Sequence, residues 1–195
     1  MIPHKLLNHV KKYSTIGGHV TIPRSKASSR AYYIKLASKT SLIYCKMVPR
    51  NSEEEPCTWG GWTLAMKLDG RLARFSYSDV LWSTEKTYNE DTGKDLNQTE
   101  TKLDAFNKLT LDHGFCVGMK VNGITKWLEI RKKSDGESAL ARFVKHGDDH
   151  TIEDREKWTS LINGSFVNET CSHAVTTEQG FNLNKYAAKA RLGMP

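Results

Sequence analysis

The chain has 195 residues, of which 38% are hydrophobic, including five Trp, seven Tyr and six Phe. Since each aromatic side chain can bury on the order of 150–250 Å², this composition supports a packed core and excludes a disordered, collagen-like or coiled-coil chain. No apolar stretch approaches the ~18–20 residues that a membrane-spanning helix needs.

Positive charge is concentrated at the start of the chain. The net charge is +7, and residues 1–50 contain ten Lys or Arg and no Asp or Glu, whereas the remainder has 19 basic and 22 acidic residues. Residues 1–30 also mix Gly, Ser and Pro with few apolar residues, which predicts a basic, weakly ordered N-terminal arm. Such an arm can keep the chain soluble, or it can bind nucleic acid, anionic membranes, heparin-like polymers or an acidic protein. The first residues lack the apolar run of a signal peptide.

The first predicted strands lie within residues 31–48, where apolar and polar residues alternate before an apolar run at 42–45, with a turn at 38–41. The polar stretch 50–56 predicts an exposed loop. Two glycines precede a third strand at 63–68, which ends at the turn signal Asp69–Gly70.

The second half of the chain begins after a long polar loop predicted at 83–101. Strands are expected at 115–121 and 125–130, and the Asn-Gly pair between them is the strongest hairpin signal in the sequence. Residues 153–162 predict a short helix with Trp158 on its apolar face, ended by an Asn-Gly pair. Strands, long loops and a few short helices together indicate an α+β domain.

Four cysteines and three glycosylation sequons bear on the compartment. The cysteines (Cys45, Cys57, Cys116 and Cys171) lack C-x-x-C spacing, which disfavours structural zinc, and their even number permits two disulfides with three possible pairings. The sequons begin at Asn97, Asn163 and Asn168, the last two in a polar loop beside Cys171. This placement favours an extracellular chain, and the missing signal peptide is then explained if the sequence is part of a longer protein.

Several stretches together resemble a fibrinogen C-terminal-like domain. YYIK at 32–35, IYCKM at 43–47 and GGWTLAMKLDG at 60–70 are similar to its opening, in order and spacing. FCVGMKV at 115–121, KWTSLINGS at 157–165, Cys171 and GFN at 180–182 resemble a divergent secreted branch, some members of which occur in skeletal organic matrices. The resemblance covers residues 31–194, and it implies an α+β domain over 31–195 with a mixed or antiparallel sheet, short helices and long loops.

The resemblance also implies disulfide bonds and an incomplete C-terminus. Cys116 and Cys171 match cysteine positions of that branch and are expected to pair; Cys45 and Cys57 are the remaining two, and their separation of 12 residues permits a second bond without requiring it. The family's cysteine upstream of Tyr32 is absent here. Its calcium loop and ligand pocket would lie beyond Pro195, so we expect neither a cofactor nor a strong calcium site.

Two clusters could carry chemistry, and each has a simpler interpretation. The segment 146–150 (HGDDH) holds metal-ligand residue types, but a short, glycine-broken polar segment is more typical of a solvated turn. The glutamates at 53–55 are expected to point into solvent. Asp112 and His113 precede Cys116 closely enough to suggest a Cys–His nucleophile pair, which a disulfide at Cys116 would exclude.

Trp59 and Trp62 flank the paired glycines and could form a stacking platform for sugars or bases. For Trp62 we favour a core position, whereas Trp59 is left open between the two roles. None of the phosphate-binding, dinucleotide-binding, nucleophile-elbow or zinc-protease motifs is present, and neither is a nucleic-acid-binding module.

The sequence therefore predicts a non-enzymatic extracellular recognition or matrix protein of fibrinogen-related type, with carbohydrate or extracellular protein ligands and a tendency to form homo-oligomers, and with no nucleic-acid partner or membrane span. One alternative is an intracellular protein that binds through its basic arm and keeps its cysteines reduced. A second alternative is a metal hydrolase that uses His146 and His150.

Overall fold

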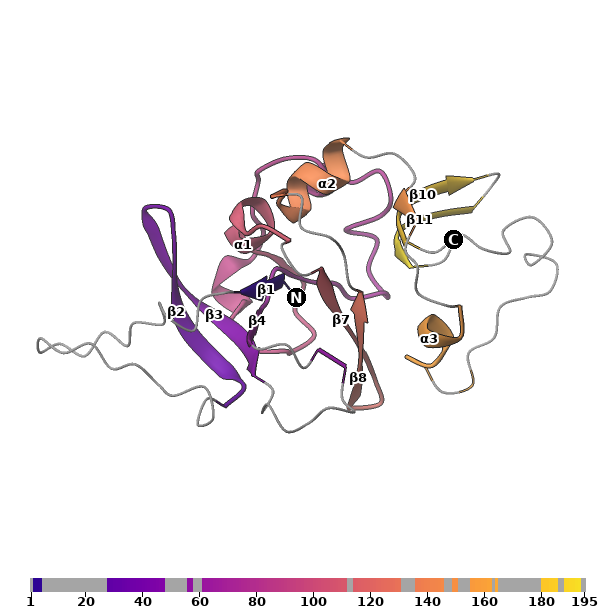
Figure 1. The fold of residues 1–195 in the computed structure, drawn as a ribbon, viewed down its shortest axis with the longest axis horizontal. Helices are drawn as coiled ribbons and strands as arrows, with labels where there is room; N and C mark the ends of the chain where they lie inside the picture. Colours follow the sequence, from indigo (N-terminus) through magenta and orange to yellow (C-terminus); the bar gives the residue numbers. More distant parts are fainter. Residues whose placement is uncertain are drawn as a thin grey trace, which may run out of the picture.

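The computed structural model describes residues 2–4, 28–47, 56–57, 61–111, 114–130, 136–145, 149–150, 155–162, 164, 180–185 and 188–193. Within these ranges, small antiparallel sheets and short helices form an α+β fold, as the sequence predicts (Figure 1). One sheet has four strands in the order β1-β4-β3-β2, another has three in the order β11-β10-β9, and β5–β6 and β7–β8 are two-stranded.

The predicted N-terminal hairpin is confirmed as β2 (Arg30–Leu36) and β3 (Lys39–Met47). Alternate side chains of β2 are buried (Tyr32, Ile34 and Leu36), because one face of the hairpin covers the core. The register pairs Leu36 with Lys39, so the turn comprises residues 37 and 38 alone and is shorter than the predicted 38–41.

The predicted third strand is two strands in two different sheets. β4 (Gly61–Thr63) pairs with β3, and β5 (Met66–Lys67) pairs with β6 (Thr101–Lys102). Between β4 and β5, Leu64 and Ala65 are consecutive and both buried. Two adjacent inward-facing residues break the period of two that a single strand requires, and the chain changes sheet there.

Residues near both ends of the predicted N-terminal arm contact the four-stranded sheet, and the arm as a whole stays a prediction. β1 (Ile2–His4) pairs with β4 in antiparallel register, with Ile2 opposite Thr63. At the other end, Ser29 donates its hydroxyl to the Met47 carbonyl (3.0 Å) and accepts from the Met47 amide (2.9 Å). Residues 5–27 lie outside the described part of the chain.

The second hairpin, β7 (Phe115–Val121) and β8 (Ile124–Ile130), matches the predicted strands and turn. Asn122 (φ 50°) and Gly123 (φ 80°) both adopt left-handed backbone conformations, as a two-residue hairpin turn of this kind requires. Gly118 lies opposite Trp127, and a Cβ at this position would overlap the Trp127 ring.

The helices are short, and two of them were not predicted. These two are α1 (Asp104–Lys108) and α2 (Ala139–Lys145), whereas α3 (Arg155–Thr159) lies inside the predicted 153–162 helix. Trp158 of α3 is buried, as its predicted apolar face requires. Helices of five to seven residues have too few turns to produce a readable apolar period.

The main core lies between the first hairpin, α1 and the long loop. Edge-to-face ring contacts join Phe75 to Trp82 (centroids 6.1 Å apart) and Trp82 to Phe106 (6.4 Å). The loop carries two 3₁₀ turns, η3 (Val80–Trp82) and η4 (Glu90–Thr92). No helix among the described residues is long and apolar enough to cross a membrane.

The last sheet comprises β9 (Asp149–His150), β10 (Gly180–Lys185) and β11 (Ala188–Gly193). β10 pairs with both of the others in antiparallel register. In Figure 1 this sheet and α3 lie on the side of the molecule away from the β2–β3 hairpin.

In the turn between β2 and β3, Ala37 has a positive φ of 51°, a conformation that favours glycine. A left-handed conformation costs a non-glycine residue about 1–2 kcal/mol. Replacing it with glycine removes this strain, but fixing the more flexible glycine backbone on folding costs about 0.5–1 kcal/mol. Ala37→Gly should therefore stabilise the protein by roughly 0.5–1 kcal/mol in urea unfolding. Ser38→Gly, at the neighbouring position without a positive φ, should give no gain; equal gains from both variants would contradict the assignment.

Candidate functional site

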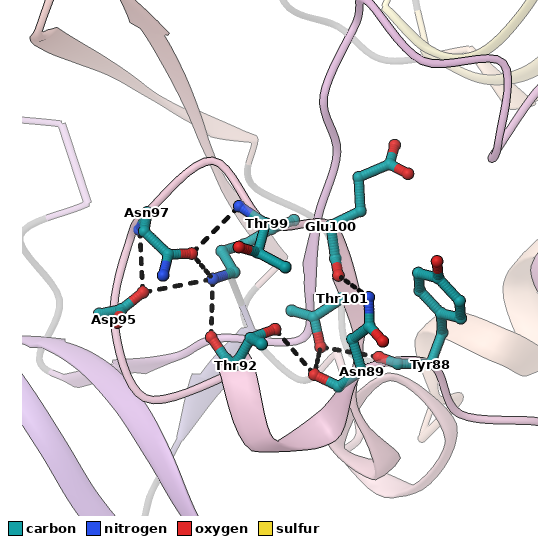
Figure 2. Close-up of polar contacts among 9 residues, drawn as sticks. Tyr88, Asn89, Thr92, Asp95, Asn97, Thr99, Glu100 and Thr101 are labelled. Atoms are coloured by element: carbon teal, nitrogen blue, oxygen red, sulfur yellow. Dashed lines mark hydrogen bonds and ion pairs between the residues drawn. The ribbon is translucent and has the colours of Figure 1, made fainter.

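A densely connected polar site in the described part of the chain surrounds Lys67 of β5. Its Nζ donates to the Thr92 carbonyl (2.7 Å) and to Oδ1 of Asn97 (2.9 Å), and it lies 3.4 Å from Oδ1 of Asp95 (Figure 2). An ammonium has three N–H donors, so these three oxygens satisfy it. We call residues 92–99, with Lys67, the Lys67 loop.

The Lys67 charge lies largely out of water, since its side chain is only 8% exposed, whereas Asp95 is 46% exposed. Burial lowers the pKa of Lys67, and the nearby Asp95 carboxylate partly offsets this effect. The ion pair is therefore asymmetric: a sheltered ammonium meets a carboxylate that solvent still reaches.

Consecutive side-chain turns shape the outer part of the Lys67 loop. Oδ1 of Asp95 accepts a hydrogen bond from the Asn97 amide (2.9 Å), and Oδ1 of Asn97 accepts one from the Thr99 amide (3.1 Å). Each bond spans two residues and replaces a backbone turn with a side-chain one. The side chains of Asn97, Gln98 and Thr99 are exposed, so this ordered turn lies at the surface.

The base of the loop is fixed by β6 and the segment before η4. Oγ1 of Thr101 lies 2.8 Å from the carbonyl oxygens of both Tyr88 and Asn89, and the Asn89 side-chain amide donates to the Glu100 carbonyl (3.1 Å) (Figure 2). Tyr88 and Lys102 also exchange two backbone hydrogen bonds of 2.9 Å. These contacts position the loop although most of it has no regular secondary structure.

A second ion pair supports the loop from the side. Asp69 accepts from Nε (2.9 Å) and Nη2 (2.6 Å) of Arg71, and the same Nη2 donates to Oε1 of Gln98 (3.1 Å). The side-chain hydrogen bonds from Arg71 lower the pKa of Asp69 to about 2. Arg71 therefore connects Gln98 to Asp69. From the sequence alone, Asp69–Gly70 is predicted only as the turn that ends a strand.

Lys102 is a fully buried lysine on β6, the strand that pairs with β5. Its side chain is fully buried, its Nζ donates to the Thr84 carbonyl, and the Nζ lies 4.8 Å from the centroid of the Phe106 ring. Burial lowers its pKa to about 8, with smaller opposing effects from Glu85 and Asp104. A hydrogen bond and an aromatic face thus replace the water that its ammonium has lost.

The structure corrects the predicted disulfide pairing. Cys57 is bonded to Cys116, and both are completely buried beside Trp62. The Trp62 indole N–H donates to the Cys57 carbonyl (2.7 Å), and the Cys57 amide donates to Oε2 of Glu129 (2.8 Å). Cys116 is therefore not paired with Cys171, because β7 faces the Cys57 segment. The disulfide also excludes the Cys–His nucleophile pair, and the core position predicted for Trp62 is confirmed.

The second suggested disulfide, between Cys45 and Cys57, is also absent. Cys45 lies in β3 as a free, buried thiol, 3.6 Å from the Ile43 carbonyl and 3.9 Å from the Thr63 hydroxyl. Burial raises the pKa of this thiol to about 12. Since a thiolate is the reactive form, Cys45 is an inert core residue.

The other candidate residues lie mostly outside the described part of the chain. These are residues 53–55, Trp59, Asp112, His113, the segment 146–148, Asn163, Asn168 and Cys171. Asp149 and His150 form the backbone of β9. Among the described residues, no group of three or more His, Cys, Asp or Glu could hold a metal ion.

The Lys67 loop was missed as a site, although part of its signal is readable. Asp95, Asn97 and Thr99 alternate oxygen-bearing side chains at every second residue, a spacing that allows successive side chains to turn inward. Lys67 lies about 30 residues earlier in the sequence, and nothing in the pattern indicates that it reaches this loop.

Comparison with protein-family models, with curated proteins and with solved structures finds no match. A cation supplied by the chain already occupies the oxygen-lined interior of the loop, while exposed amide and hydroxyl groups form its outer surface. Such a surface can bind through hydrogen bonds.

Removing the Lys67 ammonium should loosen the loop. Lys67→Met keeps the length of the side chain but removes the ammonium. The Asp95 and Asn97 oxygens keep the backbone amides of Asn97 and Thr99 as donors, whereas the Thr92 carbonyl loses its Lys67 donor. We expect a loss of about 1–3 kcal/mol in the free energy of unfolding. Amide hydrogen exchange at Asn97 and Thr99 should accelerate as well. Lys94→Met removes an exposed lysine of the same loop and should change neither quantity; equal effects of the two variants would show that Lys67 has no special role.

The lowered pKa of Lys102 should make the stability of the protein depend on pH. Its pKa is about 8 in the folded protein, against an ordinary lysine value of 10.5. Between these pH values the unfolded chain binds more protons, so stability rises with pH. Lys102→Met removes this contribution. The unfolding free energy of the wild type relative to this variant should increase by on the order of 2 kcal/mol between pH 8 and 10.5.

The comparison with a variant isolates Lys102 from other titrating groups. Burial also raises the pKa of Cys45, which lowers stability as pH rises from about 9, but this effect is common to both proteins. Lys86→Met, at an exposed lysine of the same long loop, serves as the control and should show no pH-dependent difference. A flat difference for Lys102→Met across this range would refute the prediction.

Proposed function

We propose that the chain is an extracellular, non-enzymatic recognition or matrix protein of fibrinogen-related type, which presents the Lys67 loop to a carbohydrate or an extracellular protein. The observation that carries this proposal is the buried Cys57–Cys116 disulfide. Disulfides persist in oxidising compartments and are rare in the cytosol.

The surroundings of the disulfide support a structural role. Its two sulfurs pack with Trp62 in a small core of their own, against Trp127 of β8. Lys46 lies 5.1 Å from the centroid of the Trp127 ring and covers it. The bond links a short segment before β4 to β7, across a sequence separation of 59 residues.

The described nucleophile candidates support a binding protein. Cys116 is oxidised and Cys45 is buried with a raised pKa, so neither supplies a thiolate at neutral pH. The Lys67 loop instead offers hydrogen-bonding groups on a turn that its own side chains order. A turn ordered before binding loses less entropy when a ligand is bound.

The intracellular alternative makes a different prediction for the cysteines. An intracellular protein that binds through its basic arm would keep all four thiols reduced. The two hypotheses are therefore separated by the redox state of Cys57 and Cys116 in the protein isolated from its native source.

Peptide mapping without reduction should recover Cys57 and Cys116 in one cross-linked peptide, and at most two thiols should react under denaturing conditions. The bond closes a loop of 59 residues, so the double variant Cys57→Ser, Cys116→Ser should lose about 4 kcal/mol of stability. Cys45→Ser leaves the disulfide intact and serves as the control for mapping. Four reactive thiols in the native protein would contradict an extracellular role.

A further inference from the structure

The Lys67 loop contains a group that the fold leaves unused at its surface. Asn97 begins one of the three sequons, and its Oδ1 is bound by Lys67 Nζ and the Thr99 amide. Its Nδ2 makes no hydrogen bond within the described part of the chain, and Figure 2 draws it without a dashed line, separate from the oxygen that the loop binds. Oxygen and nitrogen of one side chain thus have different roles.

The geometry points to Asn97 as an N-glycan acceptor whose glycosylation leaves the Lys67 loop intact, an inference that rests on the extracellular location proposed above. Glycan attachment to an N-x-S/T sequon modifies Nδ2. The loop is held through Oδ1, so an added sugar on Nδ2 would replace no hydrogen bond among the described residues.

The rest of the sequon is equally accessible. Gln98 and Thr99 are exposed, and the Thr99 hydroxyl makes no hydrogen bond within the described residues, whereas its backbone amide is bound to Asn97. A transferase that reads the side-chain hydroxyl and Nδ2 finds both groups at the surface of one turn. The Oε1 of Gln98 accepts from Arg71 on the neighbouring segment.

The reaction balances with one donor, an oligosaccharide linked to a lipid diphosphate. Nδ2 of Asn97 forms a bond to the anomeric carbon of the first sugar, while the bond from that carbon to the diphosphate oxygen breaks. The lipid diphosphate leaves with the electron pair, and one amide proton passes to a base of the transferase. No oxidation or reduction takes place, and the product keeps one N–H and the Oδ1 that Lys67 and Thr99 bind.

The test uses the full chain behind a cleavable signal peptide in a eukaryotic secretory host. The secreted protein is treated with a peptide-N-glycosidase in heavy-oxygen water, which converts each glycosylated Asn to a labelled Asp, and the label is located by peptide mapping. We expect a label at Asn97 in most molecules, independently of Asn163 and Asn168. Asn97→Gln should remove one glycan-dependent step in electrophoretic mobility.

Matched variants at Thr99 separate acceptor chemistry from folding. Thr99→Ala removes the sequon hydroxyl but keeps the backbone amide that Asn97 binds, so it should secrete normally and lose the label at Asn97. Thr99→Ser keeps the hydroxyl and should retain the label. Secreted wild-type protein that has the Cys57–Cys116 bond but an unlabelled Asn97 would overturn this inference and leave the proposed function standing. Reduced cysteines in the native protein would overturn the proposed function. Labelling in the secretory host would then still decide whether Asn97 is an acceptor.

Discussion

One ammonium group organises an irregular loop of this fold. Lys67 brings together the Thr92 carbonyl, the Asp95 carboxylate and the Asn97 amide oxygen. Without a cation these oxygens would repel one another and the Asp95 charge would lack its partner. Because Lys67 is held in β5, the loop is fixed to the small β5–β6 sheet by a side chain, where other proteins use a bound metal ion or further strand pairing.

The small β5–β6 sheet supplies donors to a long segment that has few pairing partners of its own. Besides Lys67, Thr101 lies within hydrogen-bond distance of two carbonyls and Lys102 donates to that of Thr84. Carbonyl groups away from water must find donors, and in this segment buried polar side chains meet that need. Desolvating the ammonium groups of Lys67 and Lys102 is costly, and Lys67 is satisfied by oxygens, whereas Lys102 has the Thr84 carbonyl and the Phe106 ring.

Local patterns in the sequence predicted the parts of the fold that depend on neighbouring residues. Both hairpins, the turn at Asn122 and the core position of Trp62 follow from alternation, a turn dipeptide and aromatic burial. The turn at Ala37 has no glycine that would have marked its position. The change of sheet before Met66 was not predicted, because the adjacent apolar residues Leu64 and Ala65 look like part of one continuous strand. Disulfide pairing and the position of Lys67 depend on contacts between distant segments, so the resemblance that suggested Cys116–Cys171 could not replace the actual geometry.

The central claim is that the chain's own lysine orders the Lys67 loop, and amide exchange with and without calcium tests it most directly. Hydrogen exchange at the Asn97 and Thr99 amides should be slower in the protein than in a free peptide of residues 92–99. This protection should be present in a chelator and unchanged on addition of calcium, because Lys67 already occupies the oxygens. Protection that appears only with calcium would contradict the account.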